Sequence, residues 1–310
     1  ARFLLGIGTI TVKKILSIIT YILKHPLNEQ HKMKALGNFM RFQIGTRLMG
    51  KKVVVPWVED SKLIVGRGET GLTGNLYAGF MEHEDMLFLL HSLQPSETFV
   101  DVGSNAGVYT VLASGVVKSK SICFEPLAET AERLKDQIYI NRIESRVSIR
   151  NVGVADKKGT LVFTNNNDTT NKVCLTGENG NTTSVDVVTI DDEISVDTQC
   201  VLKIDVEGFE YNVIEGAKNI LSSINTSALI IELNGSGGAY GHSDEEIHQK
   251  LVSFNFMPVS YEPFSRRVTQ LKTFNKNGGN TIYVKDIDLT SLRCKSAPTR
   301  IIHTANGLSI

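Results

Sequence analysis

The sequence predicts an α/β fold, a mostly parallel sheet with helices on both faces, and three observations lead to this prediction. From residue 97 onward, short hydrophobic runs alternate with longer amphipathic segments, as strands and helices do in a doubly wound sheet. The first run, Thr98–Val102, leads through a glycine turn into a helical segment, which is the opening unit of a nucleotide-binding sheet. Several later runs end in carboxylates, which parallel strands would bring to one edge of the sheet.

Composition and length narrow the class of protein. The chain has 310 residues, with 33 basic and 33 acidic side chains, and this balance argues against a nucleic-acid partner. Its four cysteines lie far apart and match no zinc spacing, so we expect a reducing compartment and a cytoplasmic protein. The length suits one large domain with an extension. We expect an N-terminal extension over residues 1–96, a main domain over 97–290 and a C-terminal tail over 291–310.

The N-terminal extension is predicted to contain helices and a hairpin. The apolar stretch Phe3–Leu23 is interrupted by Lys13 and Lys14, each of which would cost about 2.5–3.5 kcal/mol at the centre of a membrane helix. We therefore expect an amphipathic helix that packs on the domain, with attachment to a membrane surface as the alternative. A second helix is expected near residues 30–48, followed by two short strands.

A glycine-rich segment, Arg67–Phe80, follows this hairpin. Such a segment can form a mobile loop that closes over a site. The next stretch, Met81–Leu93, predicts a helix with an acidic first turn, which complements the helix dipole. These acids could serve only the helix terminus, but we predict that Glu82 contacts a cofactor and that the loop and helix together form a lid.

The turn after the first strand indicates the class of cofactor. The phosphate-binding version of this turn is G-x-G-x-x-G, and the corresponding positions here are Gly103, Asn105 and Val108. The turn, which also contains Gly107, lacks two of those glycines and instead has Asp101 two residues before its first glycine. A carboxylate suits a cationic ligand better than a pyrophosphate. S-adenosylmethionine carries two cationic groups and no phosphate, so we favour it over NAD, with a turn that serves only packing as the alternative.

A second acidic position supports a nucleotide-type cofactor. Glu125 ends the second strand about 24 residues after Asp101, where an acid holds the ribose hydroxyls in nucleotide-binding βαβ units. Pro126 follows it directly, and the loop after the third strand, which contains Val154, could line the adenine. We therefore assign Glu125, Pro126 and Val154 to cofactor binding.

Acids at the ends of the fourth and fifth strands are candidates for chemistry. Asp205 and Glu207 follow the fourth strand, and Glu232 ends the fifth. These acids should meet at the switch in strand order. An alcohol acceptor must lose a proton, so Asp205, Glu207 and the loop residue His242 are our candidates for a general base. The acids could instead hold a divalent metal through oxygen ligands, but we predict no metal.

Several stretches of the chain, in order, resemble the FkbM family of S-adenosylmethionine-dependent methyltransferases. They are GLTGNLYAGFMEHEDMLFLLHSLQP, FVDVGSNAGVYTVLAS, FEP, KIDVEGFEYNVIEGA, IIELNGSG and YEPFSRR followed by NTIYV. The resemblance implies a class I methyltransferase fold, which is Rossmann-like and has a seven-stranded sheet whose last strand is antiparallel. It also implies S-adenosylmethionine as cofactor and methylation of a hydroxyl on a carbohydrate or a secondary metabolite.

Two other functions stay open from the residues alone. One is an NAD-dependent dehydrogenase or epimerase on a Rossmann-like fold, against which the missing phosphate-loop glycines argue. The other is a non-catalytic binding module, against which the run of strand-end acids argues. The sequence indicates neither the acceptor nor the oligomeric state.

Overall fold

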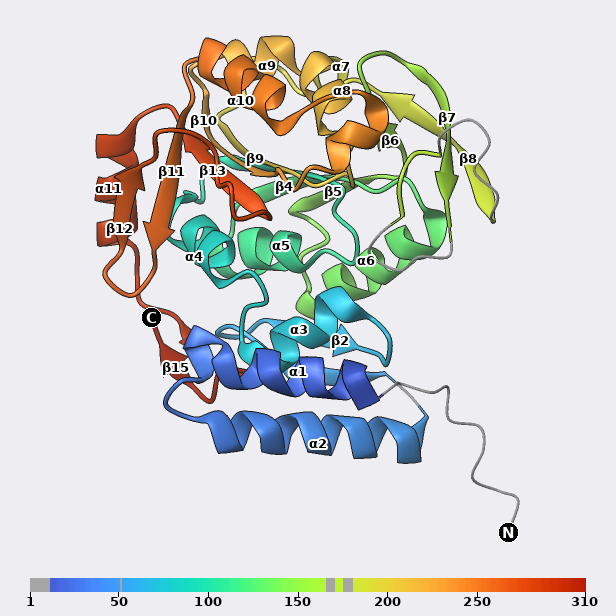
Figure 1. The fold of residues 1–310 in the computed structure, drawn as a ribbon, viewed down its shortest axis with the longest axis vertical. Helices are drawn as coiled ribbons and strands as arrows, with labels where there is room; N and C mark the ends of the chain where they lie inside the picture. The colour runs from blue at the N-terminus through green and yellow to red at the C-terminus, as the bar shows by residue number, and fades with distance from the viewer. Residues whose placement is uncertain (1–11, 51, 166–170, 175–180) are drawn as a thin grey trace.

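The computed structural model describes residues 12–50, 52–165, 171–174 and 181–310, and an eight-stranded sheet lies at its centre (Figure 1). The strand order is β12-β11-β13-β10-β9-β3-β4-β5. These strands are β3 (Thr98–Val102), β4 (Lys120–Phe124), β5 (Val147–Arg150), β9 (Cys200–Ile204), β10 (Thr226–Glu232), β11 (Met257–Glu262), β12 (Arg267–Gln270) and β13 (Asn280–Val284).

Five neighbouring strands, from β5 to β10, run parallel, and β13 runs antiparallel to both β10 and β11. The strand order reverses between β3 and β9, which places the switch point there. The predicted fold class is confirmed. The sheet has one strand more than predicted, because the chain turns back after β11 and β12 pairs with it antiparallel at the edge.

Alternation along the strands divides the core between the two faces of the sheet. Phe99 and Val201 pack on one face, whereas Val100 and Leu202 pack on the other. The first face carries α4 (His83–Ser92), α5 (Val108–Thr110) with the π-helical segment Val111–Val117, α6 (Ala128–Asn141) and, beside α4, α11 (Ile287–Ser296). The second carries α7 (Ile190–Glu193), α8 (Glu210–Glu215), α9 (Lys218–Ser222) and α10 (Asp244–Ser253).

A small three-stranded sheet adjoins β5. Its strands are β6 (Gly153–Val154), β7 (Gly159–Thr164) and β8 (Thr182–Val188), in the order β6-β8-β7. β6 follows β5 closely in the chain, so this sheet begins near the carboxyl edge of the large one.

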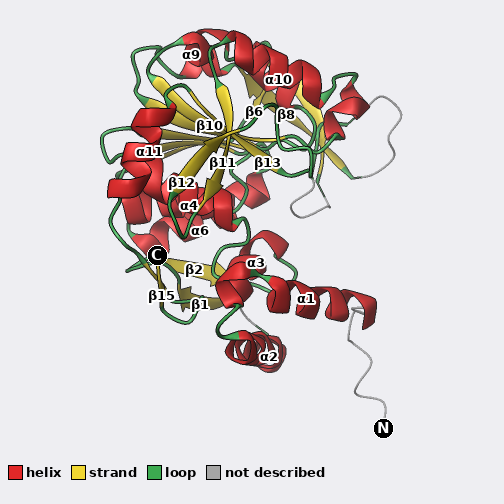
Figure 2. Ribbon diagram, turned by 60° about the vertical axis from the view of Figure 1, so that its left-hand side comes forward, coloured by secondary structure: helices red, strands yellow, loops and turns green. Residues whose placement is uncertain are grey.

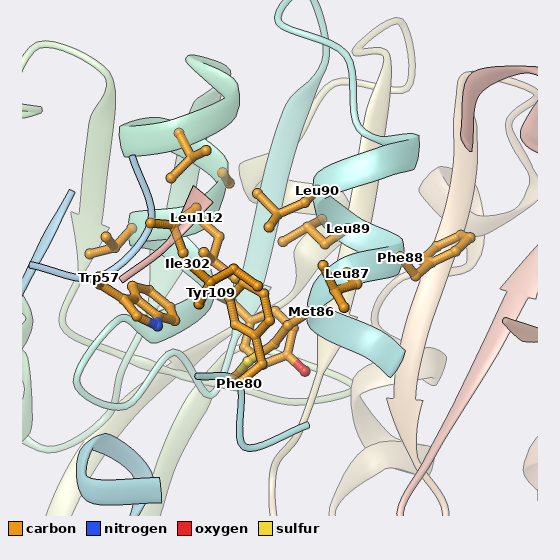
Figure 3. Packing of buried hydrophobic residues seen from close by; sticks show 14 of the residues in the cluster. Trp57, Phe80, Met86, Leu87, Phe88, Leu89, Leu90, Tyr109, Leu112 and Ile302 are labelled. Atoms are coloured by element: carbon orange, nitrogen blue, oxygen red, sulfur yellow. The ribbon is translucent and has the colours of Figure 1, made fainter. Parts of the chain in front are cut away.

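The N-terminal elements form a layer beside the first face of the sheet (Figures 1 and 2). They are α1 (Val12–Lys24), a 3-10 turn (Pro26–Asn28), α2 (Lys32–Met49), the antiparallel pair β1 (Val53–Pro56) and β2 (Lys62–Val65), and α3 (Thr70–Ala78). The chain end, with β14 (Ile301–Ile302) and β15 (Leu308–Ser309), returns to this layer. Ile302 pairs with Val58, and Figure 3 shows Trp57, Phe80 and Ile302 in one cluster with residues of α4 and α5.

The prediction of a mobile glycine-rich loop over Arg67–Phe80 is wrong, because Thr70–Ala78 forms the helix α3. Leu72 and Tyr77 of this helix are buried. Gly74 allows close packing, since a Cβ atom there would lie 2.7 Å from the sulfur of Met81. At this position glycine serves helix packing.

The first predicted helix is present from Val12 to Lys24, and the earlier part of the predicted stretch, Phe3–Thr11, lies outside the described residues. Within the described part of the chain, no helix is both long enough and apolar enough to cross a membrane.

Candidate active site

The glycine turn after β3 depends on two glycines for steric reasons. Gly103 has φ +79°, and a Cβ atom there would lie 1.9 Å from the backbone oxygen of Asp205. Gly107 has φ +80°, and its Cβ would lie 2.2 Å from a methyl carbon of Leu134 on α6. The first glycine therefore lets the ends of β3 and β9 approach each other, and the second lets α5 begin against α6.

Glu125, at the end of β4, is enclosed by this turn. Its two carboxylate oxygens accept hydrogen bonds from the backbone N–H of Asn105 at 2.9 Å and of Leu127 at 3.0 Å. Asn105 reaches this position with a left-handed φ of 49°. Burial raises the pKa of Glu125 to about 7, although both backbone donors favour the charged form. Glu125, which we predict to contact the ribose, therefore also stabilises the glycine turn through these two hydrogen bonds.

Asp101 and Lys203 lie side by side in the sheet. They are register partners on β3 and β9, so their side chains project from the same face. Asp101 accepts a hydrogen bond of 2.7 Å from the hydroxyl of Thr110, and burial raises its pKa to about 6 while Lys203 opposes the shift.

Lys203 is a site residue that sequence reasoning missed. Its ammonium lies 2.6 Å from Asp205 Oδ2 and 4.7 Å from the ring centre of Tyr109. Burial alone would lower its pKa, but nearby carboxylates, with Asp205 the strongest, raise it above the usual range. The signal was a lysine inside an otherwise apolar strand, since buried lysines are almost always paired.

Glu82 connects the start of α4 to the sheet. Its carboxylate accepts hydrogen bonds from the hydroxyl of Tyr109 at 2.7 Å and from the side-chain amide of Asn280 at 3.2 Å. The same amide donates to Asp85 at 3.0 Å, and burial raises the pKa of Asp85 to about 7. Sequence reasoning singled out Glu82 but not its partners.

Three acids from two strand ends form a cluster. The carboxylates of Asp205, Glu207 and Glu232 each place an oxygen within 4.8 Å of the others. Burial and then the charge of Asp205 raise the pKa of Glu207 to about 7, and the pKa of Glu232 to about 8. Within the described residues, Glu232 Oε2 is buried and has no hydrogen-bond partner. Such a cluster can accept a proton, accept a hydrogen bond from a hydroxyl, or hold a divalent cation.

Three neighbouring hollows at the carboxyl edge of the sheet share Gly103 as a lining residue, and together they are called the crevice. The first, of about 270 Å³, is lined by Glu82, Asp101, Asn105, Lys203 and the three clustered acids. The second, of about 60 Å³, is lined by Asn105, Glu125 and Pro126 and also by Asp205 and Glu207, and the third is lined by Pro126 and Val154. The crevice therefore suits an elongated ligand, with carboxylates at one end and a mostly apolar wall at the other.

Two of the predicted site residues lie outside the crevice. The ring of His242 stacks on Tyr211 with 3.6 Å between ring centroids, and it lines none of the three hollows. Gly107 also lines none of them, and the structure gives it the packing role described above. The other predicted cofactor and catalytic residues are brought together.

Comparison with known proteins gives one family and several distant relatives. Residues 101–258, just over half of the chain, match the family model described as the methyltransferase FkbM domain. The hexuronic acid methyltransferase AglP of Haloferax volcanii is 27% identical over 156 residues, which cover 49% of this chain and 62% of that protein. The match therefore spans less than two thirds of this relative.

Solved structures also align with the chain. A methyltransferase FkbM from Methylobacillus flagellatus KT is 17% identical, with a TM-score of 0.43, and the alignment covers 62% of this chain and 44% of that one. An rRNA methylase from Streptococcus thermophilus is 13% identical, with a TM-score of 0.38, and the alignment covers 65% and 92% of the two chains.

Proposed function

Because the chain belongs to the FkbM methyltransferase family, we propose that it transfers the methyl group of S-adenosylmethionine to a hydroxyl of a carbohydrate. The observation that carries this proposal is the crevice itself, whose hollows meet at Gly103. Glu125 lines the second hollow together with Asp205 and Glu207, and these two acids also line the first hollow with Glu232. A cofactor and an acceptor would thus lie next to each other.

The residues around the glycine turn fit the cofactor chemically. Glu125 offers carboxylate oxygens to the ribose hydroxyls, while Pro126 and Val154 offer an apolar wall to the adenine. Glu82 and Asp101 would hold the cationic end, because both line the first hollow. When bound, S-adenosylmethionine supplies a methyl group that an oxygen nucleophile can attack. The chain's main contribution is to hold the two reactants in line.

We assign the general base to Glu207. Its pKa of about 7 lies near the usual operating pH, where a base can both release and take up a proton. Its backbone has a left-handed φ of 55°, a conformation found preferentially at functional sites. Asp205 is ion-paired with Lys203, so we assign it the role of orienting the acceptor hydroxyl.

A carbohydrate acceptor is supported by the relative whose name gives hexuronic acid as its substrate. The acceptor end of the crevice is also rich in carboxylates, which are strong acceptors for sugar hydroxyls. NAD is disfavoured as cofactor because the turn has one of the three phosphate-loop glycines.

The proposal is tested with the purified chain and radiolabelled S-adenosylmethionine. Incubation with a panel of neutral sugars, uronic acids and non-carbohydrate alcohols should label at least one carbohydrate, and calorimetry should detect S-adenosylmethionine but not NAD. The variant Glu207→Gln should bind the cofactor but should label every acceptor much more slowly than the parent does. Binding of NAD in place of S-adenosylmethionine would overturn the proposal, and labelling of alcohols alone would overturn the carbohydrate assignment.

Binding of a divalent cation is the second candidate role for the acid cluster, since three carboxylate oxygens lie within 4.8 Å of one another. The methyl-transfer assay, repeated with a chelator, distinguishes cation binding by the cluster from direct proton transfer to Glu207. Activity that a chelator abolishes and magnesium restores would assign the cluster to metal binding. Activity that a chelator leaves unchanged would assign it to direct proton transfer.

A further inference from the structure

Charge is distributed very unevenly along this chain. Residues 1–52 contain ten lysines and arginines and one acid, Glu29, although the whole chain has 33 of each sign. The described part of this segment forms α1 and α2, which are the outermost elements at one end of the molecule (Figures 1 and 2). At one end of a neutral protein, α1 and α2 thus carry seven basic residues and no acid.

The outer face of α2 is apolar and exposed. Met33, Met40, Ile44 and Leu48 have exposed fractions of 79%, 52%, 52% and 82%. Their spacing of seven, four and four residues places them on one side of the helix. The residues that α2 buries, Ala35, Phe39, Phe42 and Thr46, lie on the opposite side. The stripe is thus not part of the protein core.

The charges on α2 all have one sign. Residues 32–49 contain Lys32, Lys34, Arg41 and Arg47 and no acid. All four side chains are exposed, and helical spacing places Lys34, Arg41 and Arg47 next to the apolar stripe. A helix with an apolar face and flanking basic residues has the pattern of helices that lie in the interface of an anionic bilayer.

We propose that the outer face of α2 docks on an anionic membrane surface. The stripe would enter the boundary between headgroups and acyl chains, and the flanking cations would contact anionic headgroups. A second copy of the chain fits this face less well, because symmetric pairing would bring two basic faces together. Nucleic acid would leave the four apolar side chains without partners.

Docking would place the membrane on the outer side of α2, and a hollow on the inner side of this helix lies between it and the crevice. This hollow, of about 620 Å³, lies between α1, α2 and α3 and is lined largely by apolar side chains, among them Ile18, Tyr21, Phe42 and Tyr77. Met81 lines both this hollow and the crevice. Met81 is therefore a wall shared by the hollow beneath the basic layer and the crevice where the acceptor would bind.

The test is co-sedimentation of the full chain with two kinds of vesicle, phosphatidylcholine alone and phosphatidylcholine mixed with phosphatidylserine. The parent should bind the anionic vesicles more tightly, and added salt should weaken this binding. The double variant Ile44→Ser/Leu48→Ser should weaken it by about tenfold or more. Lys34→Gln should weaken it by about fivefold. All of these side chains are exposed, so the variants should fold, and circular dichroism and cofactor affinity check this.

Matched controls come from exposed positions elsewhere on the chain. Ile224→Ser removes an apolar side chain that is 88% exposed, and Lys157→Gln removes an exposed lysine; neither should change vesicle binding. Three outcomes would overturn the proposal. They are equal or absent binding to both kinds of vesicle, a dimer in light scattering that the double variant abolishes while vesicles do not bind, and retention of nucleic acid in preference to vesicles.

Discussion

Glu125 and Glu232 occupy equivalent places in the fold but have very different surroundings. Glu125 follows β4 and Glu232 ends β10, both at the carboxyl edge of one sheet, and burial raises the pKa of the first to about 7 and of the second to about 8. Glu125 accepts hydrogen bonds from two backbone N–H groups. Within the described residues, Glu232 has one oxygen without a donor, and Asp205 and Glu207 add their negative charge beside it.

This difference in hydrogen-bond partners distinguishes the part of the crevice around Glu125, the cofactor end, from the part around Glu232, the acceptor end. The cofactor end is complete in the protein alone, because the turn supplies its own donors and needs no rearrangement to present Glu125. The acceptor end holds charge that the protein does not balance, since Lys203 pairs with Asp205 alone among the three acids. An end with unbalanced charge is where a proton, a hydroxyl or a cation gains most from binding.

The largest expected effect concerns the acceptor end. Replacing Glu207 with Gln keeps the shape and removes the base, so turnover should fall by about 100- to 10,000-fold. Cofactor affinity should stay within about threefold, because Glu125 and its donors are untouched. Stopped assays with saturating cofactor measure the first quantity, and calorimetry measures the second.

Asp205→Asn is the companion variant for this test. It removes the partner of Lys203 and should lower turnover as well, but with some loss of stability, because a buried ammonium is left without its nearest carboxylate. If Glu207→Gln keeps full turnover while Asp205→Asn loses it, the base is Asp205. If both keep full turnover, neither acid takes the proton.

The sequence predicted local features of the site well. Thr98–Val102 has the predicted bounds, because the hydrophobic pattern of a strand is a local signal. The strand-end acids followed from topology, since parallel strands share a carboxyl edge. These features need only the order of strands and helices.

The rest depended on contacts between distant parts of the chain. Asn280 binds Glu82 and Asp85 across nearly 200 residues, and only the insertion of β13 between β10 and β11 brings them together. Lys203 gains its role from its register with Asp101. The glycine-rich segment was taken for a loop because composition does not show that Met81 packs over Gly74. No local pattern encodes these contacts.

A smaller effect is expected at the cofactor end. Glu125→Ala removes charge-assisted hydrogen bonds to the ribose and two bonds within the turn, so S-adenosylmethionine affinity should fall by roughly 10- to 150-fold, or about 1.5–3 kcal/mol. Calorimetry measures this directly. Glu129→Ala, an exposed acid in the first turn of α6, is the matched control and should leave the affinity unchanged. Unchanged affinity in Glu125→Ala would remove Glu125 from the ribose site.

The smallest effect follows from the carboxyl group of Glu232, which has an unpaired oxygen within the described residues, and depends on pH. Its pKa rises from 4.5 to about 8 on folding, so between these values the folded protein keeps a proton that the unfolded chain has released. Stability from this group is therefore full below about 4.5 and is lost as the pH rises toward about 8. Glu232→Gln should gain stability relative to the parent over this window, by about 1 kcal/mol, because water partly screens the site.

Urea titrations between pH 4.5 and 8 measure the stability of Glu232→Gln, and Glu215→Gln is the opposite control in the same titrations. Burial works against ionisation of Glu215, but its bonds to Lys218 and Lys250 hold its pKa below 4.5. Its charge therefore stabilises the fold above that pH, and the Gln variant should lose stability relative to the parent where Glu232→Gln gains it. Parallel behaviour of the two variants would show that the acceptor end is electrostatically balanced after all. Opposite slopes would show that folding raises the pKa of Glu232 and lowers that of Glu215, as their different surroundings predict.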